Sequence, residues 1–150
     1  MVAARAVQTY GVSTDGLALE VMIGMKGSDT AALVAAGKPV PRPIWARALI
    51  DTASDVTCVE SVILQRLGLS ASALHTTQGI SGSAPVRLFE VSFSILGATA
   101  ASGPLLVLPH LVVMELPQPL SNVEVLIGLD VLLQCVLHVD GPGRQFTLSA

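Results

Sequence analysis

The stretch ALIDTASDVTCV, residues Ala48–Val59, decides the fold of this chain. Apolar residues run directly into Asp51, and a small turn-forming segment separates Asp51 from a second apolar stretch. A carboxylate placed there is held by rigid backbone and is partly removed from water, which is costly unless the charge is paired or hydrogen-bonded. From the spacing alone, the simplest interpretation is that Asp51 begins a turn and accepts backbone hydrogen bonds.

The residues before Asp51 predict two strands. Leu17–Met25 alternates between apolar and polar positions, which is typical of a strand with one buried face. Ile44–Ile50 predicts a second strand, with Arg47 as its only charged residue, and this strand ends at Asp51. The segment between them, Lys26–Pro43, contains two glycines and three prolines. Because proline lacks the amide donor that a sheet needs, we expect a long loop there.

The hydrophobic period changes after the turn. Val59–Leu69 places its apolar residues on one stripe, which predicts a short helix. Leu74–Leu96 then predicts a long hairpin whose two arms flank Gly79–Ser83. The returning arm slips by one residue near Phe89 and Glu90, where a β-bulge would reconcile its two halves.

The rest of the chain also predicts short strands. We expect one or two strands in Leu105–Met114, a loop in Pro117–Asn122, a strand in Val123–Ile127, a short helix or turn in Leu129–Gln134, and a closing hairpin of Val136–Val139 with Gln145–Leu148. The sequence therefore predicts an all-β fold, a small closed barrel with one or two short helices. We expect a single domain over residues 1–150, and the sequence leaves open whether residues 1–15 are ordered.

Composition and charge limit the classes of function. Hydrophobic residues make up 51% of the chain and charged residues only 13%, which suggests that some apolar surface lies in a subunit interface. The net charge is −3 and the lysines and arginines do not cluster, which argues against nucleic-acid binding. No apolar run reaches the roughly 20 residues of a membrane span, and the N-terminus lacks the apolar middle of a signal peptide. A cytoplasmic location is therefore expected.

The cysteines and histidines do not predict a metal site or a cofactor. Cys58 and Cys135 are too far apart for a zinc site, and each sits in an apolar run, so we expect buried free thiols. A disulfide or a redox role is the alternative. The three histidines, His75, His110 and His138, share no metal-ligand spacing.

Two motifs together resemble a known family. Ala48–Val59 resembles the active-site signature of aspartic proteases, in which apolar residues precede Asp-Thr-Gly-Ser/Ala and apolar residues follow. Leu126-Ile127-Gly128, before a predicted short helix, resembles a second hallmark of the retroviral type. The resemblance covers roughly Leu17–Ala150 and is closest to the small single-domain bacterial members of the retropepsin-like family. It implies a closed acid-protease barrel with a flap hairpin.

The resemblance also implies a function and a partner. Because the chain holds only one aspartate motif, an active site would need two chains, so a homodimer is expected in which each subunit supplies Asp51. Two close carboxylates cannot both ionise cheaply and share one proton, which suits general acid–base hydrolysis of a peptide bond. The substrate would be a polypeptide in an extended conformation. In this family the chain ends often form an intersubunit sheet, to which Phe146–Leu148 would be suited.

The resemblance assigns roles to particular residues. Asp51 would be catalytic, the Thr52 hydroxyl would brace the two loops across the dimer, and the backbone near Ala53 would support the carboxylates. The residues expected to contact substrate are Asp55, the flap residues Gln78, Gly79, Ile80, Ser81 and Gly82, and Ile127 with Gly128. Asp130 is expected instead to cap the helix that begins beside it.

One residue departs from the family pattern. The third signature residue is Ala53 where glycine is expected, and glycine permits close approach and unusual dihedral angles. The alternative function is therefore a catalytically impaired module that binds peptides or dimerises. A third interpretation, an unrelated β-barrel ligand carrier, requires both motifs to be coincidental.

Overall fold

The computed structural model describes residues 5–116 and 118–150 of the chain. The strands are β1 (Val7–Gly11), β2 (Ala18–Met25), β3 (Ile44–Ile50), β4 (Cys58–Glu60), β5 (Ala73–Gly79), β6 (Gly82–Ile95), β7 (Leu106–Leu116), β8 (Val125–Ile127), β9 (Val136–Asp140) and β10 (Gln145–Ser149). The helices are α1 (Gly27–Ala35), α2 (Ser61–Arg66) and α3 (Leu129–Leu132). The predicted all-β fold with few short helices is confirmed.

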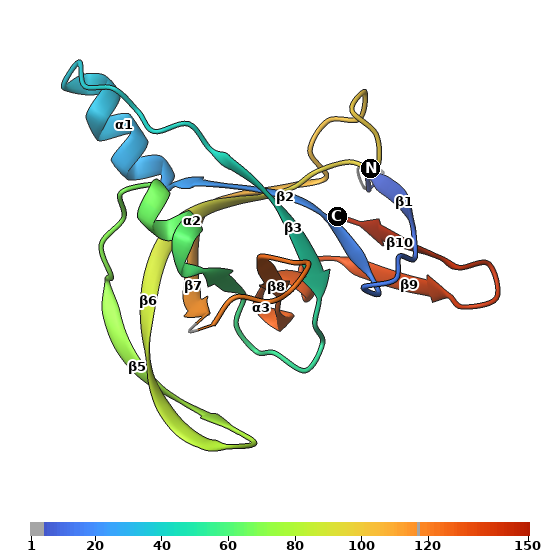
Figure 1. Cartoon of the computed structure of the whole chain (residues 1–150). Coiled ribbons are helices and arrows are strands. Elements are labelled where there is room, and N and C mark those ends of the chain that lie inside the picture. The colour runs from blue at the N-terminus through green and yellow to red at the C-terminus, as the bar shows by residue number, and fades with distance from the viewer. Residues whose placement is uncertain (1–4, 117) are drawn as a thin grey trace.

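Most strands form a closed barrel (Figure 1). Its strands follow the order β2-β3-β8-β4-β7-β6, and a second pairing of β2 with β6 closes the ring. β5 extends this sheet beyond the barrel because it pairs only with β6. Closure leaves few free strand edges and confirms the predicted small barrel.

The core fills the barrel with aliphatic residues and phenylalanine. Alternate residues of β2 and β6 point inward, and Val21, Ile23, Val91, Phe93 and Ile95 are all fully buried. Because β4 is buried along its whole length and β8 is buried at Val125 and Ile127, these short strands hold the segments that flank the Asp51 loop inside packed structure. The residues on either side of the candidate site are therefore rigidly placed.

A separate three-stranded sheet has the order β1-β10-β9. β10 lies in its middle and is paired on both edges within the chain, so Phe146–Leu148 offers no free edge to a partner. The sequence left open whether residues 1–15 are ordered, and β1 shows that Val7–Gly11 forms a strand. Residues 1–4 lie outside the described residues.

The predicted loop Lys26–Pro43 is wrong in its first half, where α1 forms. The helix spans Gly27–Ala35, has Asp29 in its first turn and buries none of its residues. Alanine-rich sequence with an acidic first turn favours a helix without any core contact. The prolines act only after the helix ends, because Gly37, with φ +66°, terminates it.

Two further boundaries differ from prediction. The helix expected in Val59–Leu69 is confined to Ser61–Arg66, because Cys58–Glu60 forms β4 between β8 and β7. Three residues buried on both faces carry no period that distinguishes a strand from a helix. The β-bulge expected near Phe89 lies instead between Val91 and Phe93.

In the part of the chain that the structure describes, no helix has the length and apolar character needed to cross a membrane.

Candidate active site

Asp51 lies at the end of β3, on the loop that leads to β4. Its backbone amide donates to the carbonyl of Ile127 at 3.0 Å, so β8 fixes the start of the loop. Its carboxylate accepts from the amide of Ala53 at 3.0 Å, and its carbonyl accepts from the amide of Ser54 at 3.2 Å. The side chain is half-buried, so one oxygen is anchored while the carboxylate still reaches the surface.

The far side of this loop is held by helix α3. The amide of Leu129 donates to the carbonyl of Ser54 at 2.8 Å, and the amide of Asp130 donates to the carbonyl of Asp55 at 3.1 Å. These amides belong to the first turn of α3 and have no partner within the helix. The loop therefore supplies acceptors for the first amides of the helix, and the helix fixes the position of the loop.

Asp130 fastens the end of the loop. Its carboxylate accepts from the Thr57 amide at 3.0 Å and from the Thr57 hydroxyl at 2.7 Å. The same hydroxyl oxygen accepts from the amide of Gly128 at 3.1 Å. Thr57 is fully buried, so these bonds supply partners that water cannot.

The prediction that Asp130 caps helix α3 is wrong, because Gly128 is the N-cap residue. Asp130 accepts from the amide of Val131 at 2.9 Å within α3, but the helix begins after Gly128 and has no side-chain N-cap bond. Its other bonds reach Thr57, which is distant in sequence. The sequence reasoning missed this pair because nothing local marks the two residues as partners.

Gly128 leaves room for the loop to pass close by. A Cβ atom at this position would lie 2.7 Å from the carbonyl carbon of Val56 and 2.9 Å from the Ser54 oxygen. Both are backbone atoms, which cannot move aside as the end of a side chain can. The glycine is thus required by close approach and not by its dihedral angles, since its φ is −90°.

Ala53 has an ordinary backbone conformation. Among the described residues, only Arg144 is a non-glycine residue with positive φ, so the alanine needs no left-handed geometry. Its side chain is exposed, as is that of Thr52. In this chain, the methyl group that replaces the signature glycine therefore introduces no backbone strain.

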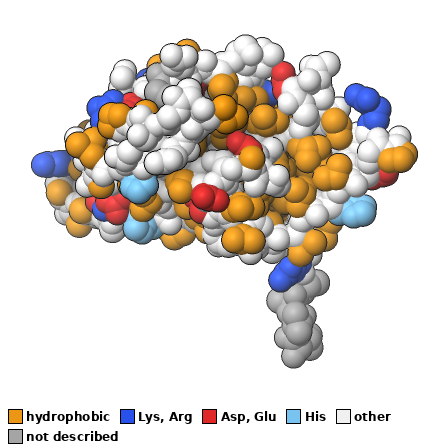
Figure 2. Space-filling model, turned by 90° about the horizontal axis from the view of Figure 1, so that it is seen from below, with side chains coloured by type: hydrophobic (Ala, Val, Ile, Leu, Met, Phe, Trp, Pro, Cys, Tyr) orange, Lys and Arg blue, Asp and Glu red, His pale blue; other side chains and the backbone are white. Residues whose placement is uncertain are grey.

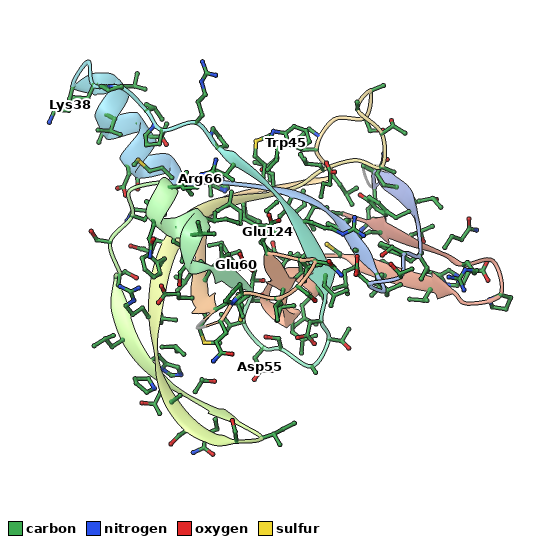
Figure 3. The ribbon with its side chains drawn as sticks, viewed as in Figure 1. Lys38, Trp45, Asp55, Glu60, Arg66 and Glu124 are labelled. Atoms are coloured by element: carbon green, nitrogen blue, oxygen red, sulfur yellow. The ribbon has the colours of Figure 1, made fainter. Side chains whose placement is uncertain are left out.

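The predicted flap is a hairpin of β5 and β6. Gly79 pairs with Gly82, which leaves Ile80 and Ser81 as the two-residue turn, and Gly82 has φ +113°. Ile80 at the tip is completely exposed. In Figure 1 the hairpin curves below the barrel on the side where the loop after β3 lies, and Figure 3 shows Asp55 at the outer end of that loop.

The base of the hairpin is tied to its neighbours by an ion pair. Arg87 Nε on β6 donates to Glu115 on β7 at 2.7 Å, and the Ser61 hydroxyl on α2 donates to the same carboxylate at 2.6 Å. The hydrogen bond from Arg87 is the main cause that lowers the pKa of Glu115 below its ordinary value. The outer part of the hairpin lacks such a tie to α2.

This ion pair predicts a specific pH dependence. Because the pKa of Glu115 is lower in the folded state, its contribution to stability is present above the ordinary glutamate pKa and is lost as the pH falls through the folded value. We expect Glu115→Gln to lower the urea midpoint at pH 7 and to have much less effect at pH 3. Glu20→Gln, on the exposed side of β2, is the control. An equal loss at both pH values would contradict the linkage.

An apolar hollow of about 410 Å³ lies between the loop and the hairpin base. Its lining comes from the loop, from α3 and from the hairpin strands with β7: Val56, His75, Leu88, Leu111, Val112, Met114 and Asp130. Hydrophobic side chains predominate in this lining, so the hollow suits an apolar group of a bound chain. The sequence reasoning missed it because its walls come from five separate elements, the loop, β5, β6, β7 and α3.

The structure brings together only part of the predicted site. Asp51, Thr52, Ala53 and Asp55 share one loop, and the side chain of Asp55 is exposed. The predicted flap residues Gln78 to Gly82 sit at the hairpin tip. Ile127 is fully buried and Gly128 supports the loop from behind, so within this chain both position Asp51; their contact with substrate stays a prediction.

Both cysteines are free thiols within the chain, as predicted, but only Cys58 is buried and Cys135 is partly exposed. Cys58 is buried beside the loop, and burial is the main cause that raises the pKa of its thiol. Burial likewise raises the pKa of Cys135. A raised pKa disfavours the thiolate, so neither cysteine has the setting of a nucleophile.

The Asp130–Thr57 pair predicts a loss of stability when it is broken. Asp130→Ala leaves the buried Thr57 amide and hydroxyl without their acceptor, which costs about 1–3 kcal/mol. We expect a matching fall in the free energy of unfolding, measured with urea, whereas Asp29→Ala on exposed α1 changes it by less than about 0.5 kcal/mol. Equal effects of the two substitutions would contradict the assigned role.

Comparison with solved structures identifies the fold. The crystal structure of a retropepsin-like aspartic protease from Rickettsia conorii is similar with a TM-score of 0.58, at 11% identity, over 99% of this chain and 96% of that chain. The retroviral protease-like domain of Ddi1 from Leishmania major is similar with a TM-score of 0.41, at 13% identity, over 84% of this chain and 83% of that chain. Comparisons with family models and with curated proteins found no match.

The chain therefore has the retropepsin-like fold that its motifs predicted. The similarity to the Rickettsia protease spans nearly the whole of both chains. At such low identity it establishes the fold, and the chemistry has to be argued from the site itself.

Proposed function

We propose that this chain is an aspartic endopeptidase whose active site is completed by a second copy. The observation that carries the proposal is the placement of Asp51. It ends a barrel strand of a retropepsin-like fold, on a loop fixed by Ile127 at its start and by α3 at its end. A reactive side chain held this firmly can be aimed at a substrate without a further ordering cost.

The chemistry requires two carboxylates at one site. One accepts a proton from a water molecule as the water attacks the scissile carbonyl, and the other donates a hydrogen bond to the oxygen on which charge develops. Two nearby carboxylates hold one shared proton, which gives them these two roles. Each chain offers a single aspartate directly after β3, Asp51, so the pair comes from a homodimer with its two-fold axis between the loops.

The proposed substrate is a polypeptide bound in an extended conformation. The β5–β6 hairpin offers exposed backbone on the side where the Asp51 loop lies, and an extended chain binds through backbone hydrogen bonds of this kind. The hollow lined by Val56, Leu88 and Met114 lies between the loop and the hairpin and would accept an apolar side chain. The preferred substrate therefore carries an apolar residue near the cleaved bond.

Ala53 is compatible with this function. Its φ is not positive, so alanine adopts the required backbone without strain. The methyl group is exposed and does not force the loop away from Ile127 or α3. Ala53 therefore gives no reason to replace peptide hydrolysis with peptide binding alone.

The test is cleavage of an unstructured polypeptide, oxidised insulin B chain, between pH 3 and pH 7. We expect cleavage beside apolar residues that is inhibited by pepstatin, a transition-state mimic for aspartic proteases. A folded dimer that cleaves at no pH would contradict the proposal. Ala53→Gly would then separate an impaired protease, which regains activity, from a binding module, which does not.

A further inference from the structure

The last strand of the three-stranded sheet has an open edge. β9 pairs with β10 on one side, and no strand pairs with its other edge among residues 5–116 and 118–150. Half of the backbone amides and carbonyls of an edge strand point outward with no ladder partner. Natural sheets usually protect such an edge with lysine, proline or a bulge. The β9 sequence, VLHVD, contains neither lysine nor proline, and its one carboxylate, Asp140, accepts from the amide of Gly143 in the following turn.

The packed face of this sheet is also left uncovered at the Val139 end of β9, although Leu137 on the same face packs against the core. One row across the sheet consists of Tyr10, Phe146 and Val139, whose side chains lie on the same face. Tyr10 is 8% exposed and Phe146 is 0% exposed, but Val139 is 49% exposed. The apolar face therefore continues beyond the part of the sheet that the chain itself covers.

The opposite edge of the sheet is covered by the chain. The hydroxyl of Tyr10 on β1 donates to the carbonyl of Leu96 at 2.7 Å, and the side chain of Gln8 accepts from the amide of Ala98 at 3.1 Å. The segment after β6 thus packs against β1. The two edges of the sheet differ, because β1 is held to the segment after β6 by these two bonds, whereas no such bond is made by the side chains of β9 to another segment of the described chain except its own turn.

The exposed apolar surface extends from β9 toward the candidate site. Leu133, which directly follows α3, is 80% exposed, and Val136 at the start of β9 is 51% exposed. α3 itself holds the Asp51 loop through its first amides. Figure 2 views the molecule from below and shows hydrophobic side chains gathered on the part of this face that lies over β9.

We infer that the open edge of β9 pairs antiparallel with β9 of a second copy of this chain. This rests on the proposed function, because an active site with one aspartate per chain is incomplete without that copy. A two-fold axis pairs a strand with its own copy antiparallel, so the same axis serves both β9 and Asp51. The result is one continuous sheet across the dimer, with β10 and β1 outside β9 in each copy. β1 and β10 stay in their own subunit, since they pair with each other within the chain.

The experiment places a charge at the proposed interface. Val139→Lys would put an ammonium group where the partner strand covers the face, and a second one would approach from the partner. Sedimentation velocity over a dilution series is expected to show a dimer dissociation constant at least ~100-fold higher than that of the unchanged chain. Val7→Lys is the matched control, because Val7 is 59% exposed on the other edge strand of the same sheet. It is expected to change the dissociation constant less than threefold.

A mixing experiment distinguishes a lost contact from a damaged fold. Equal amounts of Val139→Lys and Val139→Glu chains are expected to form a dimer at least tenfold more stable than either variant alone. A dimer that survives Val139→Lys unchanged, a larger loss with Val7→Lys, or no gain on mixing would overturn the inference. So would an unchanged chain that stays monomeric at 100 micromolar.

The same samples separate the interface from the chemistry. Cleavage of oxidised insulin B chain that persists while Val139→Lys leaves the dimer intact would refute the β9 interface and leave the proposed protease standing. If Val139→Lys breaks the dimer but the unchanged dimer never cleaves a peptide, the β9 interface stands and the proposed protease is refuted.

Discussion

Asp51→Asn is expected to lower the rate of peptide cleavage by about 10³-fold or more. An amide cannot take the proton from the attacking water, and a homodimer loses both carboxylates at once. The Asp51 carboxylate accepts a bond from Ala53 within its own loop, and an asparagine side-chain oxygen can accept the same bond. The fold and the dimer should therefore persist, and kcat should fall while binding of peptide remains.

The matched control for this substitution is Asp29→Asn. Asp29 is an exposed aspartate on α1, and the same change in charge there is expected to leave the cleavage rate within about twofold. The measurement is the initial rate of cleavage of oxidised insulin B chain at the optimal pH, with thermal unfolding as a check on the fold. Equal rates for Asp51→Asn and the unchanged chain would show that Asp51 is not catalytic.

Gly128→Ala is expected to lower activity at least ~100-fold, because the new methyl group would meet the backbone of Ser54 and Val56. These backbone atoms belong to the loop that carries Asp51, so relief of the contact displaces the carboxylate. Overpacking of this kind also costs about 1–3 kcal/mol of stability. We expect kcat to fall more steeply than the thermal midpoint.

Gly141→Ala is the control, since a Cβ atom there meets nothing within 4 Å. Gly141 lies in the turn between β9 and β10, and its substitution should leave both activity and the thermal midpoint close to those of the unchanged chain. If Gly128→Ala retained full activity, the loop would not depend on the close packing described above.

The fold and part of the site were predictable because their signals are local. The run of apolar residues into Asp51 marks a strand end, and Leu126–Gly128 marks its neighbour in the barrel. The hairpin around Gly79–Gly82 follows from alternation and glycine. Each of these signals lies within one segment and does not depend on which other segment packs against it.

The features that the sequence did not predict depend on distant partners or on weak local preferences. The role of Asp130 rests on Thr57, a buried residue far away in sequence. β4 is too short to show a period, and its identity comes only from β8 and β7 beside it. α1 was missed because its helical preference was outweighed by the prolines that follow it.

The most direct test of the shared site mixes unchanged and Asp51→Asn chains after both have been dissociated and allowed to reassociate. If one active site needs Asp51 from both chains, the activity per total protein falls as the square of the fraction of unchanged chain. An equal mixture would then show about one quarter of the full activity. If each chain worked alone, the same mixture would show about one half, and that result would contradict the account.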